Sequence, residues 1–259
     1  MVLLEPRGAV WHNVNIILPS NHPEAAMGYV ILETTEYPAM SGSNTICVAT
    51  VLLETGILPM VEPVTKLVLE APAGLIRVRC ECRDGKVLSV QPAFCYHRDA
   101  MVEVAGLGSV RMDVAYGGMT YAMVEAANLG FAIEPHEARD LCDLGQRLKA
   151  AVEQLPVAYP GNPDMPGITN TEFMGPLRRE NGQLVAHNTV VVSPGRCDRS
   201  PCGTGSSARL ALMHARDEIK AGETFIHESI TGSRFTCQID GLTRLAQYDA
   251  VIPAIAGQA

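Results

Sequence analysis

Two short segments, far apart in the chain, share one pattern of residue types. In each, a side chain able to transfer a proton precedes a glycine and a hydroxyl residue, and an apolar helical run follows. The segments are Ser41-Gly42-Ser43 and Cys202-Gly203-Thr204. A helix N-terminus presents unpaired backbone N–H groups and the positive end of the helix dipole, so it binds carboxylates. We therefore predict two such termini, each carrying a proton-transfer group, facing one small substrate from opposite sides.

The composition and charge of the chain narrow the class of molecule that it can bind. The 259 residues are 47% hydrophobic and 19% charged, as in a globular protein. The formal net charge of −8, without a cluster of Lys or Arg, argues against nucleic-acid and anionic-membrane partners. The longest apolar run, 46–53, is too short to span a membrane and lacks the basic flank of a signal peptide. We predict a soluble, cytoplasmic protein that acts on a small molecule.

The cysteines favour reduced thiols. Eight occur, at positions 47, 80, 82, 95, 142, 197, 202 and 237. In a chain of this size without a secretory signal, an even number does not indicate disulfides. Cys80 and Cys82 alternate with charged residues and precede an Asp84-Gly85 turn, which is typical of a strand with one buried face. A metal site at this pair is the weaker alternative, because no histidine lies at ligand spacing nearby.

Hydrophobic periodicity predicts a mixed α+β protein. Strands are expected at 14–18, 28–33, 67–90, 112–114, 121–124, 189–192, 225–229 and 235–239. Helices are expected at 45–55, from Pro135 onward, and at 206–217. The repeated pattern at Ser41 and Cys202 suggests two similar halves, each contributing one helix to a central cleft.

Two common nucleotide and hydrolase motifs do not fit. Gly203, Gly205 and Ala208 match the loose spacing of a dinucleotide fingerprint, but about ten residues of loop separate them from the preceding strand. A G-x-S-x-G nucleophile elbow is absent from the sequence. Neither a nicotinamide enzyme nor an α/β-hydrolase is therefore indicated.

The segment 198–205, Asp-Arg-Ser-Pro-Cys-Gly-Thr-Gly, resembles the second active-site motif of the proline racemase family. That family includes hydroxyproline epimerases and trans-3-hydroxy-L-proline dehydratases. Further matching stretches lie at 4–8, 113–118, 192–195 and 227–235, so the resemblance covers nearly the whole chain. It implies a cofactor-free enzyme with two α/β halves related by a pseudo-twofold axis, similar to diaminopimelate epimerase, and an active site in the cleft between them.

We also predict where the two halves divide. We expect the first half to comprise 1–72 with 242–259, the second to comprise 73–241, and the chain to cross between them near Pro72-Ala73-Gly74. Relative to the family pattern, the chain begins at the 4–8 motif and ends at Ile255-Ala256-Gly257. The first half is therefore expected to lack its terminal strands. A homodimer is left open.

Site residues follow from the resemblance, position by position. Cys202 matches the second catalytic cysteine, and Asp198, Gly203 and Thr204 match substrate-contacting positions. The first motif of the racemases reads Met-Cys-Gly-His, whereas this chain reads Met40-Ser41-Gly42-Ser43. Ser41 thus stands at the first catalytic position, with Gly42 and Ser43 beside the substrate. No cofactor and no metal is implied.

The exchange of a thiol for a hydroxyl changes the expected reaction. A thiol ionises far more readily than a serine hydroxyl, which disfavours a symmetrical two-thiol proline racemase. Family members with such a pair are associated with dehydration of trans-3-hydroxy-L-proline to Δ1-pyrroline-2-carboxylate and with 4-hydroxyproline 2-epimerisation. We predict one or both of these activities. The alternatives are an epimerase or racemase without dehydratase activity, and a non-catalytic imino-acid binding protein.

Overall fold

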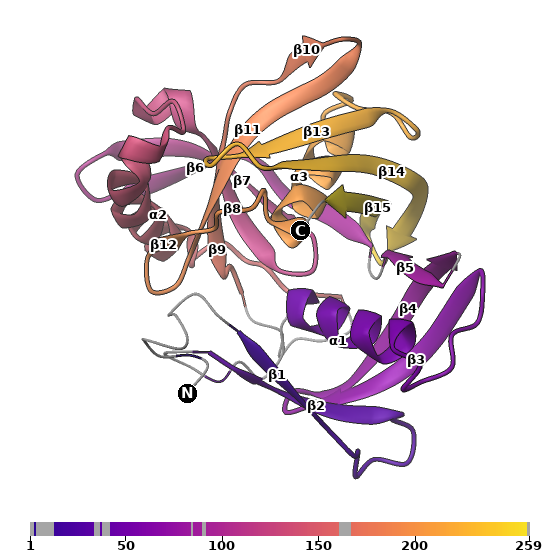
Figure 1. The fold of residues 1–259 in the computed structure, drawn as a ribbon. Coiled ribbons are helices and arrows are strands. Elements are labelled where there is room, and N and C mark those ends of the chain that lie inside the picture. The colour runs from indigo at the N-terminus through magenta and orange to yellow at the C-terminus, as the bar shows by residue number, and fades with distance from the viewer. Residues whose placement is uncertain are drawn as a thin grey trace. The chain divides into compact units, whose positions relative to one another are not determined.

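The computed structural model describes residues 3, 13–33, 37, 42–83, 85–89, 92–160 and 167–257 (Figure 1). The chain divides into two compact units, Met1–Gln91 and Pro92–Ala259. Each unit combines a sheet with helical structure, which confirms the predicted mixture of α and β structure.

The described part of the first unit is a five-stranded sheet with one helix. Its strands are β1 (Val14–Leu18), β2 (Met27–Leu32), β3 (Val64–Ala71), β4 (Gly74–Arg83) and β5 (Lys86–Ser89), and its helix is α1 (Gly42–Glu54). The strands lie in chain order, and only the β2–β3 pair is parallel. Buried side chains of α1, among them Val48 and Leu52, pack with Tyr29, Ile31 and Leu69 of the sheet. The helix therefore covers one face of the sheet and forms the core of this unit.

The alternation around Cys80 and Cys82 has the predicted structural meaning. Both thiols lie on β4, are 0% and 3% exposed, and share the buried face of the sheet with Val78. Successive side chains of a strand point to opposite faces, and Arg77, next to the buried Val78, is exposed. The interpretation of this segment as a half-buried strand is confirmed.

The boundary between the units differs from the one expected from the sequence. Ala71 pairs with Gly74 across the β3–β4 turn, so the Pro72-Ala73-Gly74 segment closes a hairpin within the first unit. Gly74 has a φ of +111°, which a residue without a Cβ adopts without strain. The division lies between Gln91 and Pro92 instead, and residues 242–257 belong to strands of the second unit.

The second unit contains the remaining elements. Its strands are β6 (Ala93–Val104), β7 (Gly108–Tyr116), β8 (Thr120–Glu125), β9 (Asn170–Met174), β10 (Arg178–Glu180), β11 (Gln183–Val192), β12 (Arg196–Cys197), β13 (Thr224–Ser229), β14 (Arg234–Leu245) and β15 (Tyr248–Gly257). Its helices are α2 (Ala138–Val152) and α3 (Gly203–Ala215), with short 3₁₀ turns at Ala126–Leu129 and Pro135–Glu137.

The sheet of the second unit closes on itself. The order β11-β13-β14-β15-β6-β7-β8-β9 returns to β11, because β9 also pairs with β11. Helix α3 packs against β6, β7, β8, β14 and β15, and every residue from Thr204 to Met213 is buried. The strands therefore form a closed ring, and α3 packs against the inner face of that ring. Figure 1 shows strands of this sheet around α3.

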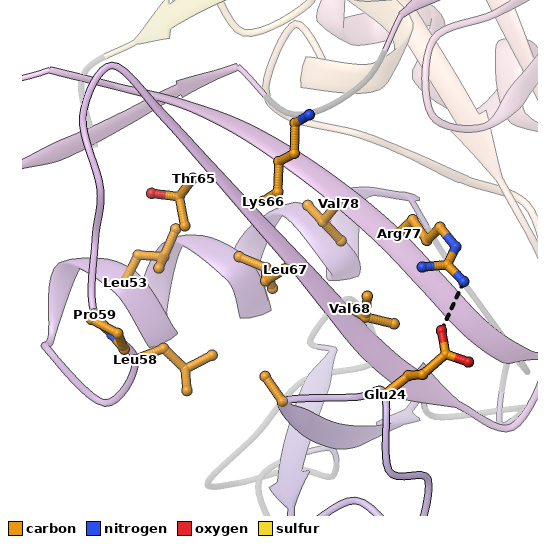
Figure 2. Close-up of a pocket in the computed structure, with 11 residues that line it drawn as sticks. Glu24, Leu53, Leu58, Pro59, Thr65, Lys66, Leu67, Val68, Arg77 and Val78 are labelled. Atoms are coloured by element: carbon orange, nitrogen blue, oxygen red, sulfur yellow. Dashed lines mark hydrogen bonds and ion pairs between the residues drawn. The ribbon is translucent and has the colours of Figure 1, made fainter.

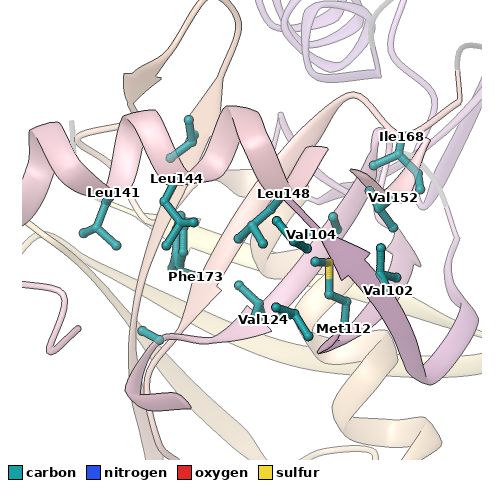
Figure 3. Packing of buried hydrophobic residues seen from close by; sticks show 14 of the residues in the cluster. Val102, Val104, Met112, Val124, Leu141, Leu144, Leu148, Val152, Ile168 and Phe173 are labelled. Carbon is teal, nitrogen blue, oxygen red and sulfur yellow. The ribbon is translucent and has the colours of Figure 1, made fainter. Parts of the chain in front are cut away.

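Helix α2 packs on the other face of the same sheet. The side chains of Leu141, Leu144, Leu148 and Val152 form an apolar stripe on this helix that is buried and packs with Phe173 of β9 (Figure 3). Side chains of β8 pack on both faces of the sheet. Tyr121 and Met123 face α3, whereas Ala122 and Val124 face α2. Among the described residues, no helix is long and apolar enough to cross a membrane.

Candidate active site at the start of helix α3

Cys202 occupies the residue immediately before α3. Its φ is +62°, an uncommon value for a residue with a side chain. Cys202 is half-buried and Gly203 is exposed, whereas Thr204 is buried. The thiol and the first N–H groups of the helix therefore lie together at the point where the buried helix reaches the surface of this unit.

A chain of hydrogen bonds holds the turn that presents this thiol. Oδ1 of Asp198 accepts hydrogen bonds from the backbone N–H and the hydroxyl of Ser200, both at 2.9 Å. The Ser200 hydroxyl oxygen in turn accepts the N–H of Cys202 at 3.0 Å. The N–H of Asp198 is bound to the carbonyl of Val190 on β11. The sheet thus anchors the loop, and Asp198 is placed beside the cysteine.

Two hydroxyl groups lie close to the sulfur of Cys202. Oη of Tyr121 lies 3.3 Å from Sγ of Cys202 and 2.5 Å from Oγ1 of Thr204. Thr204 Oγ1 itself lies 3.7 Å from the sulfur. The side chain of Thr204, expected to contact substrate, is 3% exposed and is bound to Tyr121.

The surroundings oppose ionisation of this thiol. Burial, together with the nearby negative charge of Asp198, raises the pKa of Cys202 to about 12. The hydrogen bonds from Tyr121, the Gly205 N–H and Thr204 act in the opposite direction on that pKa. These surroundings therefore favour the thiol form of Cys202, which can donate a proton, and nearby positive charge would favour its thiolate.

A buried polar cluster lies behind the first turn of α3. Nδ2 of Asn188 donates to the carbonyl of Pro201, next to Cys202, at 2.8 Å and to Oε1 of Glu172 at 3.2 Å. Nδ1 of His227 lies 2.8 Å from the hydroxyl of Ser206. The Asn188, Glu172 and His227 side chains come from β11, β9 and β13 and are fully buried. Three strands therefore support the cysteine turn from inside.

The titratable members of this cluster are neutral at neutral pH. Burial raises the pKa of Glu172 to about 8, although Arg209 and Asn188 partly offset this effect. Burial, with Arg209 and His187 nearby, holds the pKa of His227 well below its usual range. The carboxyl is thus protonated and the imidazole uncharged, because burial penalises the charged form of both groups.

Glu172 is expected to make the stability depend on pH. Its folded-state pKa of about 8 lies above the ordinary 4.5 of the unfolded chain. Below pH 4.5 both states are protonated, whereas between pH 4.5 and 8 only the unfolded chain ionises. The free energy of unfolding therefore falls as pH rises through this window, by at most about 5 kcal/mol.

Glu172→Gln removes this ionisation while keeping the side-chain shape. The variant should become progressively more stable than the wild type between pH 5 and pH 8, as measured by chemical denaturation at both values. Parallel pH dependence in the two proteins would contradict a raised pKa at Glu172.

The first predicted motif is described only in part. Ser41 lies outside the described residues, and α1 begins at Gly42, so the backbones of Gly42 and Ser43 form its first residues. The helix expected after Ser41 is therefore present. The roles of Ser41, Gly42 and Ser43 in catalysis and binding stay predictions.

A shallow groove of about 500 Å³ lies elsewhere, in the first unit (Figure 2). Apolar side chains including Leu53, Leu58 and Val78 form part of its lining. Glu24 and Arg77 at its rim are bound to each other at 2.9 Å, and Lys66 extends away from it. None of the predicted site residues lines this groove.

Sequence reasoning missed the side chains that support Cys202. Tyr121, Glu172 and Asn188 lie on strands 14 to 81 residues away in the sequence and are buried. Only their types offered a signal, because an amide or a carboxyl that is buried in a strand must have polar partners. No metal-binding group of three His, Cys, Asp or Glu residues occurs within the part of the chain that the structure describes.

The architecture itself has known relatives. A methylitaconate Δ-isomerase matches with a TM-score of 0.54 over 95% of this chain and 79% of its own, at 14% identity. A PhzF-family phenazine biosynthesis protein from Bacillus anthracis matches with a TM-score of 0.55 over 95% and 81%, at 13% identity. These similarities define the fold class of the chain, that of the PhzF and diaminopimelate-epimerase-like proteins with two similar α/β halves.

Closer similarities identify the family. A hydroxyproline epimerase from Agrobacterium vitis, solved with bound trans-4-hydroxy-L-proline, is 41% identical, with a TM-score of 0.75 over 99% of this chain and 75% of its own. A probable proline racemase from Agrobacterium radiobacter K84, solved with bound carbonate, is 38% identical, with a TM-score of 0.77 over 99% and 76%. The proline racemase family model matches residues 1–259. The chain belongs to the proline racemase family, as its motifs predicted.

Proposed function

We propose that this protein inverts the α-carbon of a hydroxyproline without a cofactor, with 4-hydroxyproline 2-epimerisation as its main reaction. The observation that carries the proposal is the thiol of Cys202, held by hydrogen bonds at the exposed N-terminus of a buried helix. The 41% identity to a hydroxyproline epimerase with bound trans-4-hydroxy-L-proline supports this substrate class.

The start of α3 is suited to an amino-acid zwitterion. Its first N–H groups, at Gly203 and Thr204, and the helix dipole favour a substrate carboxylate. The proposed partner of the substrate ammonium is Asp198. That ion pair would neutralise the charge that raises the pKa of Cys202 and would bring a positive charge near the sulfur. Substrate binding would thereby promote formation of the thiolate that removes the α-proton.

The second proton-transfer group in this proposal is Ser41. Cys202 breaks the α C–H bond on one face, the carboxylate at the helix N-terminus stabilises the carbanion, and Ser41 returns a proton to the opposite face. A hydroxyl is a weaker acid than a thiol, so reprotonation through Ser41 is expected to be the slower step.

Dehydration of trans-3-hydroxy-L-proline is the second candidate reaction. It is favoured by the serines at positions 41 and 43, where the racemase motif has cysteine and histidine. Elimination requires a base at the α-carbon and an acid at the departing 3-hydroxyl, so it does not need two matched thiols. The α-proton and the hydroxyl leave as water, and the resulting enamine tautomerises to Δ1-pyrroline-2-carboxylate.

Incubation with each hydroxyproline isomer in D₂O, followed by NMR, tests both candidates. Deuterium at the α-carbon with accumulation of the epimer supports epimerisation, and Δ1-pyrroline-2-carboxylate supports dehydration. Neither exchange nor product with any isomer would refute the proposed catalysis and favour the non-catalytic binding protein.

Ser41→Cys should shift the partition between the two reactions. A second thiol protonates the carbanion more readily, so the ratio of epimer to Δ1-pyrroline-2-carboxylate should rise about tenfold if the barrier falls by about 1.4 kcal/mol. The ratio is measured from trans-3-hydroxy-L-proline under identical conditions. Ser43→Cys, with its thiol two residues later, is the control and should not raise the ratio. An unchanged or lower ratio in active Ser41→Cys would exclude Ser41 as the second proton-transfer group.

A further inference from the structure

The hydroxyl of Tyr121 is fully enclosed beside the sulfur of Cys202. Tyr121 is 0% exposed, and its Oη lies 3.3 Å from Sγ of Cys202 and 2.5 Å from Oγ1 of Thr204. It reaches this position from β8, whose side chains at 121 and 123 face α3. Burial excludes water, so the phenol must find its hydrogen-bond partners among these two side chains.

The number of O–H donors on Tyr121 and Thr204 determines how many hydrogen bonds these two hydroxyls can donate to the sulfur. Tyr121 and Thr204 each carry one O–H donor, and the 2.5 Å contact between them uses one of the two. The remaining O–H is available to the sulfur, either from Tyr121 at 3.3 Å or from Thr204 at 3.7 Å. A thiolate only accepts hydrogen bonds, so this donor binds the charged form more strongly than the thiol.

We infer that Tyr121 is a further residue of the reaction, whose hydroxyl donates a hydrogen bond to the Cys202 sulfur when that atom is negatively charged and is held in place by Thr204. The inference rests on the proposed role of Cys202 in proton transfer. Thr204 then contributes in two ways, because its side chain orients the phenol while its backbone belongs to the helix N-terminus.

The chemistry requires such a donor. Burial and Asp198 both oppose ionisation of Cys202, and Tyr121 is the first of the groups that counteract them. Other titratable or charged groups around this turn include Arg199 within it, Glu172 on β9, His227 on β13 and Arg209 on α3. All of these groups are retained when only the hydroxyl of Tyr121 is removed. A change in the ionisation of Cys202 in that variant therefore reports on Tyr121.

Tyr121→Phe deletes one oxygen and tests the inference without assuming catalysis. The rate of Cys202 alkylation by iodoacetamide is followed between pH 6 and 10 by mass spectrometry of the modified peptide. Loss of a charge-assisted hydrogen bond should lower the thiolate fraction about tenfold. Because a more basic thiolate is a better nucleophile, alkylation should slow about fourfold at each pH.

With the substrate that the wild type turns over, kcat for α-proton exchange should fall about tenfold in Tyr121→Phe while KM changes little. The matched control is Tyr116→Phe, which removes another buried phenol hydroxyl, one bound to Tyr159 rather than to the cysteine. It should leave the alkylation rate unchanged. If Tyr121→Phe does not fold, Thr204→Val provides the test and should slow alkylation in the same direction by a smaller factor.

An alkylation profile of folded Tyr121→Phe that coincides with that of the wild type overturns the inference, as does an unaltered profile in Thr204→Val where that variant provides the test. If the wild type exchanges no α-proton with any isomer, the proposed function fails, and the alkylation measurement still decides the role of Tyr121.

Discussion

Replacing Cys202 with serine is expected to abolish α-proton exchange and product formation while leaving the protein folded. Cys202 is the thiol at the exposed start of α3, and a serine hydroxyl there would ionise far less readily. Loss of a general base at the reacting carbon costs on the order of a thousandfold in rate. Deuterium exchange of 4-hydroxyproline, followed by NMR, measures this loss, and circular dichroism verifies the fold.

Cys142→Ser is the matched control for this variant. Cys142 is a half-buried thiol on α2, 3.3 Å from Cys197, and it belongs to no predicted site. Exchange should persist in Cys142→Ser. Near wild-type exchange in Cys202→Ser would remove the thiol from the proposed mechanism.

Gly117→Ala is expected to have the largest effect on stability. A Cβ at this position would lie 2.2 Å from the carbonyl oxygen of Thr204 and 2.3 Å from the backbone nitrogen of Ala208. Both atoms belong to the backbone of α3, which is enclosed by the sheet and cannot move aside. We expect the free energy of unfolding to fall by more than about 4 kcal/mol, or the variant to be insoluble.

Gly167→Ala controls for the loss of glycine itself. There the added Cβ would meet only Cγ2 of Val157, at the ordinary distance of 3.7 Å. Urea denaturation should place this variant within about 1 kcal/mol of the wild type. Wild-type stability in Gly117→Ala would show that β7 and α3 lie farther apart than the structure has them.

Local patterns predicted the elements whose periodicity is strong. The strand expected at 14–18 is β1 (Val14–Leu18), and the helix expected from Pro135 contains α2 (Ala138–Val152) with its apolar stripe buried. The helices after Ser41 and Cys202 begin at Gly42 and Gly203, close to the expected starts. These elements were predictable because alternation and helical spacing reflect burial of a single face.

Other elements had no comparable signal. The strands β6, β9, β10, β12 and β15 were not predicted, and the structure places residues 242–257 in its second unit. Strand β9 (Asn170–Met174) carries Asn, Thr and Glu yet is buried throughout. Polar side chains hide a strand from hydrophobicity analysis when their partners come from distant segments.

The sequence by itself determined the family and the residues proposed for proton transfer, because a run such as Asp198-Arg199-Ser200-Pro201-Cys202 is specific without any knowledge of packing. Only the tertiary structure decided what surrounds the thiol. Tyr121 and Cys202 are 81 residues apart in the chain, and their contact exists because the sheet closes around α3. The ionisation of a buried group depends on such neighbours and on the exclusion of water, and neither is encoded in local spacing.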